Sequence, residues 1–417
     1  MANHDNPVII VGAGIAGLSC ARKLHRENIS FKLLEATSQI GGRVKTDHQD
    51  GFLLDRGFQV LQTAYPEARR TLNYSRLRLQ GFAPGAMVRI GGRVFTIADP
   101  LRKPARLFET VTAPIGTFRD RIRLLRLVHE VNRMPLERLF DLPEESTMEF
   151  LRTRGFSETM IARFFVPFFG GVCLDPQIGA SSRVFRYVLR MFAAGDAALP
   201  LKGMAQIPRQ LAEGLPQADV LTGMRVRHVN PSGVTLVDGT ALAAGAVVIS
   251  SEAPATVSLL NLTQFQRSVP ETCLYFSCPH TPAHPPYLLL NGNGRGPINN
   301  VVFPSSVSPA YAPRGKSLAS VVVLGHEVGD PETLLQRVKV QLLEWFGSEA
   351  AKWRHLATYE IRHALPDQSP PTENPYRLNP MVRPGIFVCG EHGSLPGIQW
   401  AMVSGRRAAE AVIAYLA

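Results

Sequence analysis

The segment Val8–Glu35, with the sequence VIIVGAGIAGLSCARKLHRENISFKLLE, decides the fold of this chain. An apolar run leads into a glycine-rich turn, a helical pattern, a second apolar run and a terminal acid. In such a unit Gly12 permits the tight turn, Gly14 lets a pyrophosphate approach the backbone, and Gly17 lets the helix pack on the strand. The helix N-terminus favours phosphate, and Glu35 can accept hydrogen bonds from a ribose diol. The segment therefore predicts a Rossmann-like dinucleotide-binding unit in an α/β protein.

Composition narrows the class of protein. The chain has 417 residues, 45% hydrophobic and 19% charged, which indicates a folded protein long enough for two domains. Its five cysteines are scattered and odd in number, which argues against a disulfide framework and favours a reducing compartment. No apolar run approaches the roughly 20 residues of a membrane span, and no leader peptide is recognisable. We expect a cytoplasmic location.

The formal net charge of +11 points to an anionic partner. No nucleic-acid recognition module is evident, so we expect no nucleic acid and consider an anionic membrane surface first. Between Arg119 and Arg138, apolar residues recur at helical spacing beside Arg119, Arg121, Arg123, Arg126 and Arg133. This pattern predicts an amphipathic basic helix. It is either an ordinary surface helix over a core or a membrane-surface contact.

Two copies of one tetrapeptide differ in context. Gly41-Gly42-Arg43-Val44 follows the dinucleotide-binding unit, which suits a second backbone approach to a long cofactor, with Arg43 meeting phosphate or carbonyl oxygens. Gly91-Gly92-Arg93-Val94 lies between two strand-like runs and predicts a β-hairpin turn. Further along, turns at Asn230–Gly233 and Asp238–Gly239 indicate a β-insert that returns to the cofactor sheet.

The C-terminal end of the sequence contains a second strand–glycine–acid motif. Ile386–Glu391 reads as a buried strand ending in Gly390-Glu391, and Gly397–Ala401 leads into a last helix. Together with the N-terminal unit this resembles the flavin-containing amine oxidase superfamily, which includes monoamine and polyamine oxidases, protoporphyrinogen oxidase and phytoene desaturases. One βαβ unit holds only the ADP half of FAD, so a separate Gly-acid element suits the flavin half. FAD is therefore favoured over a nicotinamide cofactor.

The resemblance implies a domain organisation and a set of cofactor residues. A discontinuous Rossmann-like FAD-binding domain would comprise residues 1–75, 200–260 and 380–417, and a discontinuous α+β substrate domain would comprise residues 76–199 and 261–379. The implied cofactor-binding residues are Gly12, Gly14, Ala16, Gly17, Glu35, Ala36, Gly41, Gly42, Arg43, Gly57, Phe58, Gln59, Val226, Gly390, Glu391, Gln399, Trp400 and Ala401. Val226 would meet the adenine through its backbone, residues 55–59 would lie near the flavin, and Gln399–Ala401 would cap its pyrimidine edge.

Departures from the pattern bear on the reaction. Many amine oxidases carry a lysine, bridged by water to flavin N5, on a strand of the substrate domain; the segment that looks equivalent, Thr272–Phe276, has none. No covalent attachment motif is evident, so we expect non-covalent FAD. Residues 156–192 are rich in aromatics, which form either core or the wall of an apolar cavity. Pro167, Gly170 and Gly171 favour a cavity wall or loop over a packed helix there.

The leading hypothesis is an FAD-dependent oxidoreductase that oxidises or desaturates an apolar, isoprenoid- or carotenoid-like substrate by hydride transfer to the flavin. The alternatives are a flavin amine oxidase and a redox-silent, flavin-binding isoprenoid carrier. The electron acceptor stays open. Catalytic residues are not identified, with Lys202 and His363 as weak candidates. Cys273, Cys278, His280 and His284 have the ingredients of a zinc site, but strand and proline context favours a structural role, and we expect no metal.

Overall fold

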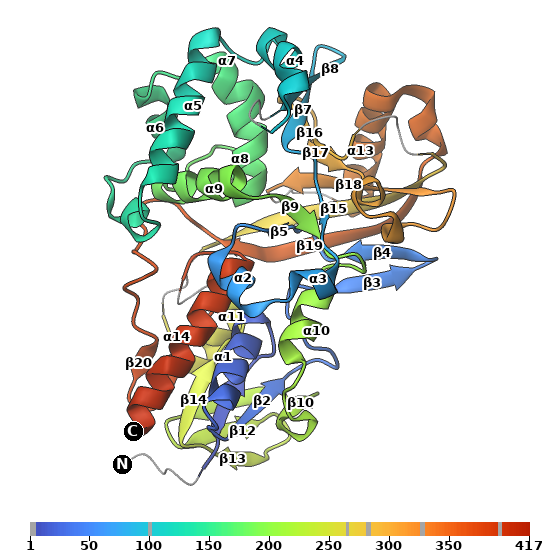
Figure 1. The fold of residues 1–417 in the computed structure, drawn as a ribbon. Coiled ribbons are helices and arrows are strands. Elements are labelled where there is room, and N and C mark those ends of the chain that lie inside the picture. Colours follow the sequence, from blue (N-terminus) through green and yellow to red (C-terminus); the bar gives the residue numbers. More distant parts are fainter. Residues whose placement is uncertain (1–5, 99–101, 264–266, 281–284, 326–329, 391–393) are drawn as a thin grey trace.

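A six-stranded sheet forms the lower part of the molecule in Figure 1. The computed structural model describes residues 6–98, 102–263, 267–280, 285–325, 330–390 and 394–417. In spatial order the strands are β10 (Val220–Thr222), β2 (Phe31–Glu35), β1 (Val8–Val11), β14 (Ala246–Ile249), β21 (Ile386–Val388) and β20 (Met381–Arg383). All neighbours pair in parallel except β20, which is antiparallel to β21. The predicted Rossmann-like α/β fold is confirmed.

Both faces of this sheet are covered, which explains why its strands are apolar throughout. Val8 and Ile10 pack beneath α1 (Ile15–Arg26) and α14 (Ile398–Leu416). Ile9 and Val11 pack on the opposite face against a small antiparallel sheet, β11 (Val226–Asn230), β12 (Gly233–Leu236) and β13 (Ala241–Ala243), and against α11 (Ala253–Leu260). The predicted β-insert therefore forms and leads back into the sheet through β14.

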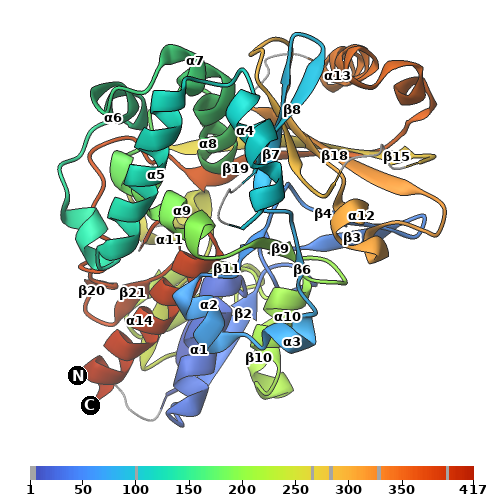
Figure 2. The same cartoon turned by 45° about the horizontal axis from the view of Figure 1, so that its top comes forward.

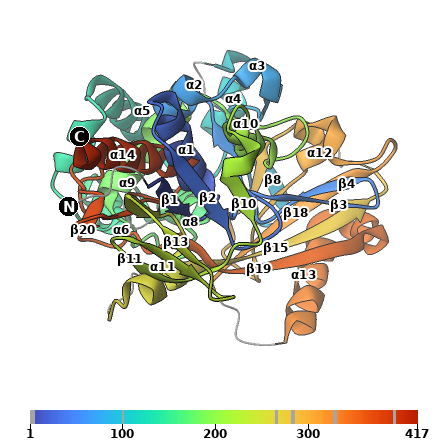
Figure 3. The ribbon, with the colours of Figure 1, turned by 90° about the horizontal axis from the view of Figure 1, so that it is seen from below.

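A second, mixed sheet of seven strands lies above the first. Its order is β19 (Arg354–Pro366), β15 (Ser268–Cys278), β18 (Ser317–Leu324), β17 (Ile298–Val302), β16 (Leu288–Asn291), β7 (Gly85–Ile90) and β8 (Arg93–Ala98). Helix α13 (Pro331–Phe346) packs on it through Leu334, Val338 and Leu342. Gly91 and Gly92, with positive φ, form the turn between β7 and β8, as predicted. Figure 3, seen from below, shows β15 and β19 running alongside the first sheet's end.

Helices gather beside the seven-stranded sheet, as the turned view in Figure 2 shows. They are α4 (Leu107–Thr112), α5 (Phe118–Arg133), α6 (Thr147–Thr153), α7 (Glu158–Met160), α8 (Val166–Cys173) and α9 (Ser182–Ala194). Ile161–Phe165 is a π-helical turn between α7 and α8, so residues 158–173 are helical throughout. The expectation of a loop around Pro167 was wrong, because the π-helical turn just before it changes the hydrogen-bond pattern, with the Val166 N–H bonding to the Ile161 carbonyl, and the helix continues through the proline.

The predicted basic helix is α5, which begins with a capping box between Thr117 and Asp120. It ends at Arg133 because Met134 precedes a proline and is extended. No helix among the described residues is long and apolar enough to cross a membrane.

Short elements connect the two sheets. They are β3 (Thr46–Gln49) with β4 (Phe52–Asp55), the small sheet of β5 (Leu61–Gln62), β9 (Ala197–Leu199) and β6 (Gln80–Gly81), and the helices α2 (Pro66–Thr71), α3 (Tyr74–Leu77), α10 (Gln206–Ala212) and α12 (Pro304–Val307). The strands of the first sheet fall inside the three segments assigned to the FAD-binding domain, and those of the seven-stranded sheet fall outside them. The division into domains stays a prediction.

Helix α14 crosses α1 with almost no space between the two backbones. A Cβ atom at Gly405 would lie 2.1 Å from the carbonyl oxygen of Ala16. Gly405→Ala should therefore lower stability, although alanine is the better helix former by about 1 kcal/mol. Overpacking costs typically about 1–3 kcal/mol, and here the obstacle is main chain that cannot rotate away. A lower urea midpoint, followed by circular dichroism, is expected.

Ala414→Ser, at an exposed position of the same helix, serves as the control and should leave the midpoint unchanged. A Gly405→Ala protein at least as stable as the wild type would contradict the close packing of α1 and α14.

Candidate functional site

The glycine turn after β1 holds its predicted geometry. Gly12 has a φ of +106°, and its N–H donates to the Leu34 carbonyl at 2.7 Å. A Cβ at Gly17 would lie 2.0 Å from the Gly12 carbonyl oxygen, and the Ser250 hydroxyl donates to that same oxygen at 2.6 Å. The first turn of α1 therefore rests directly on the glycine turn and on the end of β14.

Two glycine segments face each other at the N-terminus of α1. The Gly41 N–H donates to the Ala13 carbonyl at 2.8 Å, and Gly14 pairs with Gly41 as an isolated parallel bridge. A Cβ at Gly42 would lie 3.2 Å from the Gly14 Cα. We call Gly12–Gly14 with Gly41–Gly42 the glycine cradle. Gly14 gives α1 no side-chain cap and the first turn holds no acid, so the helix N-terminus can offer N–H groups to a phosphate.

Glu35 closes one side of the glycine cradle. It is 8% exposed, its Oε2 accepts from the Ala13 N–H at 3.0 Å, and its Oε1 accepts from the Thr37 N–H and hydroxyl at 2.9 and 2.8 Å. Ala36 is half-buried beside it. The Met224 N–H donates to the Glu35 carbonyl at 2.8 Å. This contact brings Val226, two residues further on, to the end of β2 where the adenine contact was expected.

Arg43 leads from the glycine cradle toward the seven-stranded sheet. Its guanidinium donates to the carbonyls of His363 and Ala364 on β19, at 3.0 and 2.7 Å. The Gln59 amide donates to the Arg43 carbonyl at 3.0 Å, while the Gln59 Oε1 is buried and accepts no hydrogen bond from the residues that the structure describes. The second glycine motif and residues 57–59 therefore meet at the ends of β15 and β19.

Glu271 completes this corner, and sequence reasoning missed it. It lies on β15 with 6% of its surface exposed, and its Oε1 accepts from the Phe58 N–H at 3.0 Å. Burial raises the pKa of Glu271 to about 7, and the Phe58 N–H partly offsets that rise. Glu271 directly precedes Thr272–Phe276, the segment that looks equivalent to the lysine-bearing strand. The available signal was a lone acid within a strand that is otherwise largely apolar.

The C-terminal element lies on the other side of β1. The Gly390 N–H donates to the Ser404 hydroxyl of α14 at 2.8 Å, and Gly390 has a φ of +99°. Glu391 lies outside the described residues. Helix α14 begins at Ile398 after Gly397, again without a side-chain cap, so its first N–H groups have no intrahelical acceptor.

The side chains of Gln399 and Trp400 are occupied inside the protein. Gln399 Oε1 accepts from the main-chain N–H groups of Glu67 and Ala68, at 2.9 and 3.4 Å, and so caps α2. The Trp400 ring is buried against Phe140, Tyr187 and Tyr376. The Gln399 oxygen is therefore engaged by α2, while Trp400 Nε1 is a buried donor without an acceptor among the described residues.

Neither weak catalytic candidate gains support from its position. Lys202 is an exposed residue of the turn between β9 and α10. His363 is half-buried on β19, where its Nδ1 lies 2.5 Å from the Ser268 hydroxyl, and its carbonyl holds Arg43. Cys273 and Cys278 are buried in β15, and the described residues hold no group of three metal-ligand side chains. His284 lies outside the described residues.

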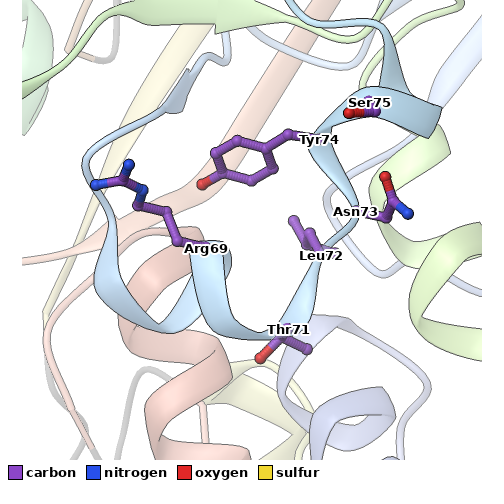
Figure 4. Close-up of a pocket in the computed structure, with 6 residues that line it drawn as sticks. All are labelled: Arg69, Thr71, Leu72, Asn73, Tyr74 and Ser75. Atoms are coloured by element: carbon purple, nitrogen blue, oxygen red, sulfur yellow. The ribbon is translucent and has the colours of Figure 1, made fainter.

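Two surface pockets were found away from the glycine cradle. Figure 4 shows one of about 460 Å³ at α2 and α3, with Arg69 and Tyr74 on opposite sides of it. Its lining contains none of the predicted cofactor residues. The other, of about 610 Å³, lies between residues 81–84, the segment 102–106 and Tyr287. Its Phe82 ring meets the Phe58 ring edge to face, with 6.3 Å between centroids.

Comparison with known proteins decides the family. The model of the flavin containing amine oxidoreductase family matches residues 15–413. The chain belongs to this family. It is an FAD-dependent oxidoreductase by membership, as the sequence analysis predicted, and FAD is its cofactor.

Curated relatives and solved structures agree with this assignment. Polyamine oxidase 3 of Oryza sativa subsp. japonica is 24% identical over 292 residues, 64% of this chain and 56% of that protein. Protoporphyrinogen oxidase 2 of Arabidopsis thaliana is 27% identical over 172 residues, which cover 41% of this chain and 33% of that protein. The chain thus spans about half or less of these relatives. A putative protoporphyrinogen oxidase from Exiguobacterium sp. 255-15 has a TM-score of 0.73 at 17% identity, with 98% of each chain covered. Putrescine oxidase bound to putrescine has a TM-score of 0.71 at 16% sequence identity, with 98% of this chain and 99% of that chain covered.

The residues present fit FAD. The glycine cradle leaves main chain open where a Cβ would close it, Glu35 stands at the end of β2, and Gln59 Oε1 is a buried acceptor without a donor from the protein. The ADP half would lie between Gly14, Gly42 and Glu35, and the flavin half toward residues 57–59. Individual cofactor contacts stay predictions.

The repeated tetrapeptide provides a test of the glycine cradle. Gly42→Ala should weaken FAD binding at least about tenfold, which corresponds to about 1.4 kcal/mol, because the new Cβ would lie 3.2 Å from Gly14 Cα at a φ of +59°. Titration of apoprotein with FAD, followed by quenching of flavin fluorescence, measures the affinity.

Gly92→Ala is the matched control. It imposes alanine on a φ of +79° in the same tetrapeptide, but no atom lies within 4 Å of its Cβ. It should lower stability slightly and leave the FAD affinity unchanged. Equal loss of FAD affinity in both variants would show that backbone strain, and not the glycine cradle, limits binding.

Proposed function

We propose that this enzyme oxidises an apolar, isoprenoid-like substrate by hydride transfer to FAD. The observation that carries the proposal is the pocket of about 610 Å³ beside Phe82. Phe82 joins this pocket to Phe58, the residue whose N–H binds Glu271 at the expected flavin end of the site. The ring contact between Phe82 and Phe58 thus connects the lining of the pocket, which also includes Arg102, Lys103, Arg106 and Asp196, to the expected flavin end.

An aromatic row supports an apolar substrate. Phe164 and Phe168 are stacked with 5.3 Å between centroids, and Phe192 meets Phe168 edge to face at 5.0 Å. All three are half-buried, whereas Phe165 and Phe169 of the same helix are core residues. Phe164 and Phe168 pack between the helical core and the β7–β16 side of the sheet. Half-buried aromatic surface of this kind suits an apolar ligand.

Bound FAD supplies the two-electron acceptor for a hydride, and the chain supplies placement. The glycine cradle and Glu35 fix the ADP end, Arg43 and Gln59 link it to β19, and the aromatic residues position the substrate and exclude water. Amine oxidation is the second candidate, since two of the matched proteins are named polyamine oxidase and putrescine oxidase. The absence of a lysine at Thr272–Phe276 speaks against the lysine-dependent form of that reaction.

Anaerobic reduction of the bound flavin separates the two reactions. A detergent-solubilised isoprenoid polyene should bleach the visible flavin absorption, whereas putrescine and spermidine should leave it unchanged. Bleaching by the amines alone would overturn the apolar-substrate proposal. No bleaching by any substrate would favour the redox-silent carrier.

Phe82→Ala should raise the KM for the polyene about tenfold and change kcat little, because burying one aromatic side chain contributes about 1.5–3 kcal/mol. The control is Phe346→Ala, which should leave KM unchanged. Phe346 is a half-buried aromatic residue of α13 that packs against the hydrophobic cluster between α13 and the seven-stranded sheet. Steady-state kinetics at saturating and limiting polyene measure both quantities.

We also propose an anionic membrane surface as the place where the substrate is collected. Helix α5 buries Leu127 and Val131 in the core but exposes Phe118 by 63% and Leu125 by 49%. Phe118, Ile122 and Leu125 follow helical spacing, with exposed Arg119, Arg126 and Arg133 beside them. Phe108 of the neighbouring α4 is 79% exposed, two residues from Arg106 at the pocket described above. Exposed aromatics flanked by arginines suit anionic lipid.

Replacing Phe108 and Phe118 together by serine should abolish co-sedimentation with phosphatidylserine-containing vesicles at low salt, while the wild type sediments. Val340→Ser, at an exposed apolar position of α13, is the control and should sediment like the wild type. Wild-type protein that stays in the supernatant would refute the membrane proposal without affecting the substrate assignment.

A further inference from the structure

Glu271 is an acid in an apolar setting. Its cross-strand neighbours are Ile361 on β19 and Leu324 on β18, and no salt bridge of the described residues includes it. Its recorded hydrogen bond is the one from the Phe58 N–H. A buried carboxyl with one donor is costly to keep, because charge in an apolar setting needs compensation.

The second oxygen of Glu271 lies over the Gly57 turn. A Cβ at Gly57 would lie 3.1 Å from Glu271 Oε2 and 2.7 Å from the Ile361 methyl. Gly57 also has a φ of +92°, so the turn keeps this position free of side chains. The loop predicted to lie beside the flavin therefore passes directly against the carboxyl.

Asp55, on the strand before this loop, shows what a structural carboxyl looks like. It is buried as well, but it accepts from the Thr46 hydroxyl at 2.5 Å, the Tyr311 hydroxyl at 2.7 Å and the Met204 N–H at 3.0 Å. These three contacts join β3, β4, the turn before α10 and the segment after α12. Among the described residues Glu271 has one donor, the Phe58 N–H, so a purely structural role does not explain it.

The charged and titratable groups around Glu271 are engaged elsewhere. On its own strand Cys273 contacts the Ser320 hydroxyl, and Tyr275 donates to the Asp55 carbonyl. On β19 Tyr359 donates to Asp47, and His363 contacts Ser268.

In the loops packed against β15, Arg43 donates to β19 carbonyls and Arg56 pairs with Asp47. Within the described residues, burial and the Phe58 N–H are the dominant influences on the ionisation of Glu271.

We propose that Glu271 exchanges the substrate proton during oxidation. Dehydrogenation of a C–C or C–N single bond removes two hydrogens: one leaves as a hydride to the bound cofactor, and the other leaves as a proton while the double bond forms. The Glu271 carboxylate accepts this proton at Oε2, becomes a neutral carboxylic acid, and later releases the proton to solvent. The electrons reside on the cofactor and the charge on Glu271 is restored, so the step balances.

The ionisation of Glu271 suits this task. Burial holds its pKa at about 7, near the value at which a group donates and accepts protons most effectively at neutral pH. The raised pKa means that the neutral acid predominates below about pH 7 and the base above it. Oxidation should therefore increase as pH rises through this value. The proposal rests on FAD-dependent dehydrogenation and does not depend on which substrate is oxidised.

The test uses the FAD-loaded protein without substrate. Infrared difference spectra between pH 5.5 and 8.5, together with the visible flavin spectrum, should report a buried carboxyl titrating near pH 7. Asp55, whose pKa burial raises to about 6, contributes a separate signal that Asp55→Asn removes. Glu271→Gln should abolish the titration near pH 7. Glu360→Gln, an exposed acid on β19 opposite Thr272, removes the same charge from the neighbouring strand and should retain it.

Kinetics provide the second readout once a reducing substrate is found. Glu271→Gln should lower kcat about 10²–10⁴-fold, as expected for loss of a proton-transfer group, and should remove the rise with pH. If the glutamine protein fails to bind FAD, Glu271→Asp keeps the carboxyl and should shift the titration instead. A titration near pH 7 that persists in Glu271→Gln, or that is absent from the wild type, would overturn the proposal. Neither result bears on whether the substrate is a polyene or an amine.

Discussion

Main-chain atoms of the glycine turn and of the first helix lie where side chains at two glycines would have to be. The Gly12 carbonyl occupies the space of a Gly17 side chain, and the Ala16 carbonyl occupies that of Gly405. Helix α1 is thereby held against the glycine turn on one side and against α14 on the other. This contact sets the direction of the helix N-terminus, which the glycine cradle needs for phosphate. It also joins the first and last elements of the chain, so the two ends of the sequence form one site.

The helix N-termini that these contacts hold in place carry partial positive charge. The N-termini of α1 and α14 both begin at glycines without side-chain caps. Their N–H groups and helix dipoles would be costly to leave without an acceptor. Other helix ends vary: Thr117 and Ser146 form capping boxes and Gln399 supplies the acceptor for α2, whereas α10, α11 and α13 have no side-chain cap. At α1 and α14 the glycines also leave the main chain free of side chains, which suits the approach of an anionic cofactor.

The sequence predicted the parts of the fold that depend on local spacing. The Val8–Glu35 unit, the Gly91–Gly92 hairpin and the β-insert carry their geometry within a few residues, because positive φ and close approach demand glycine. Contacts between distant segments carry no such signal. Glu271 meets Phe58 across 213 positions, and Gln399 meets Glu67 across 332. The loop expected at Pro167 was wrong because a π-helical turn, which the sequence does not reveal, carries the helix through this proline.

Glu271 both holds the Gly57–Phe58 loop, through the Phe58 N–H, and titrates near neutral pH. A lysine on this strand would place a positive charge beside the loop of Gly57 and Phe58. The Glu271 carboxyl, with a pKa of about 7, is mostly uncharged below that pH. The apolar neighbours Ile361 and Leu324 keep the dielectric low and so maintain that pKa. Below about pH 7 the neutral acid adds no charge beside the Phe58–Phe82 pair, and above it the carboxylate is present to accept a proton. One buried carboxyl can thus serve both an apolar substrate and a proton transfer, which a permanently charged side chain at the same position could not.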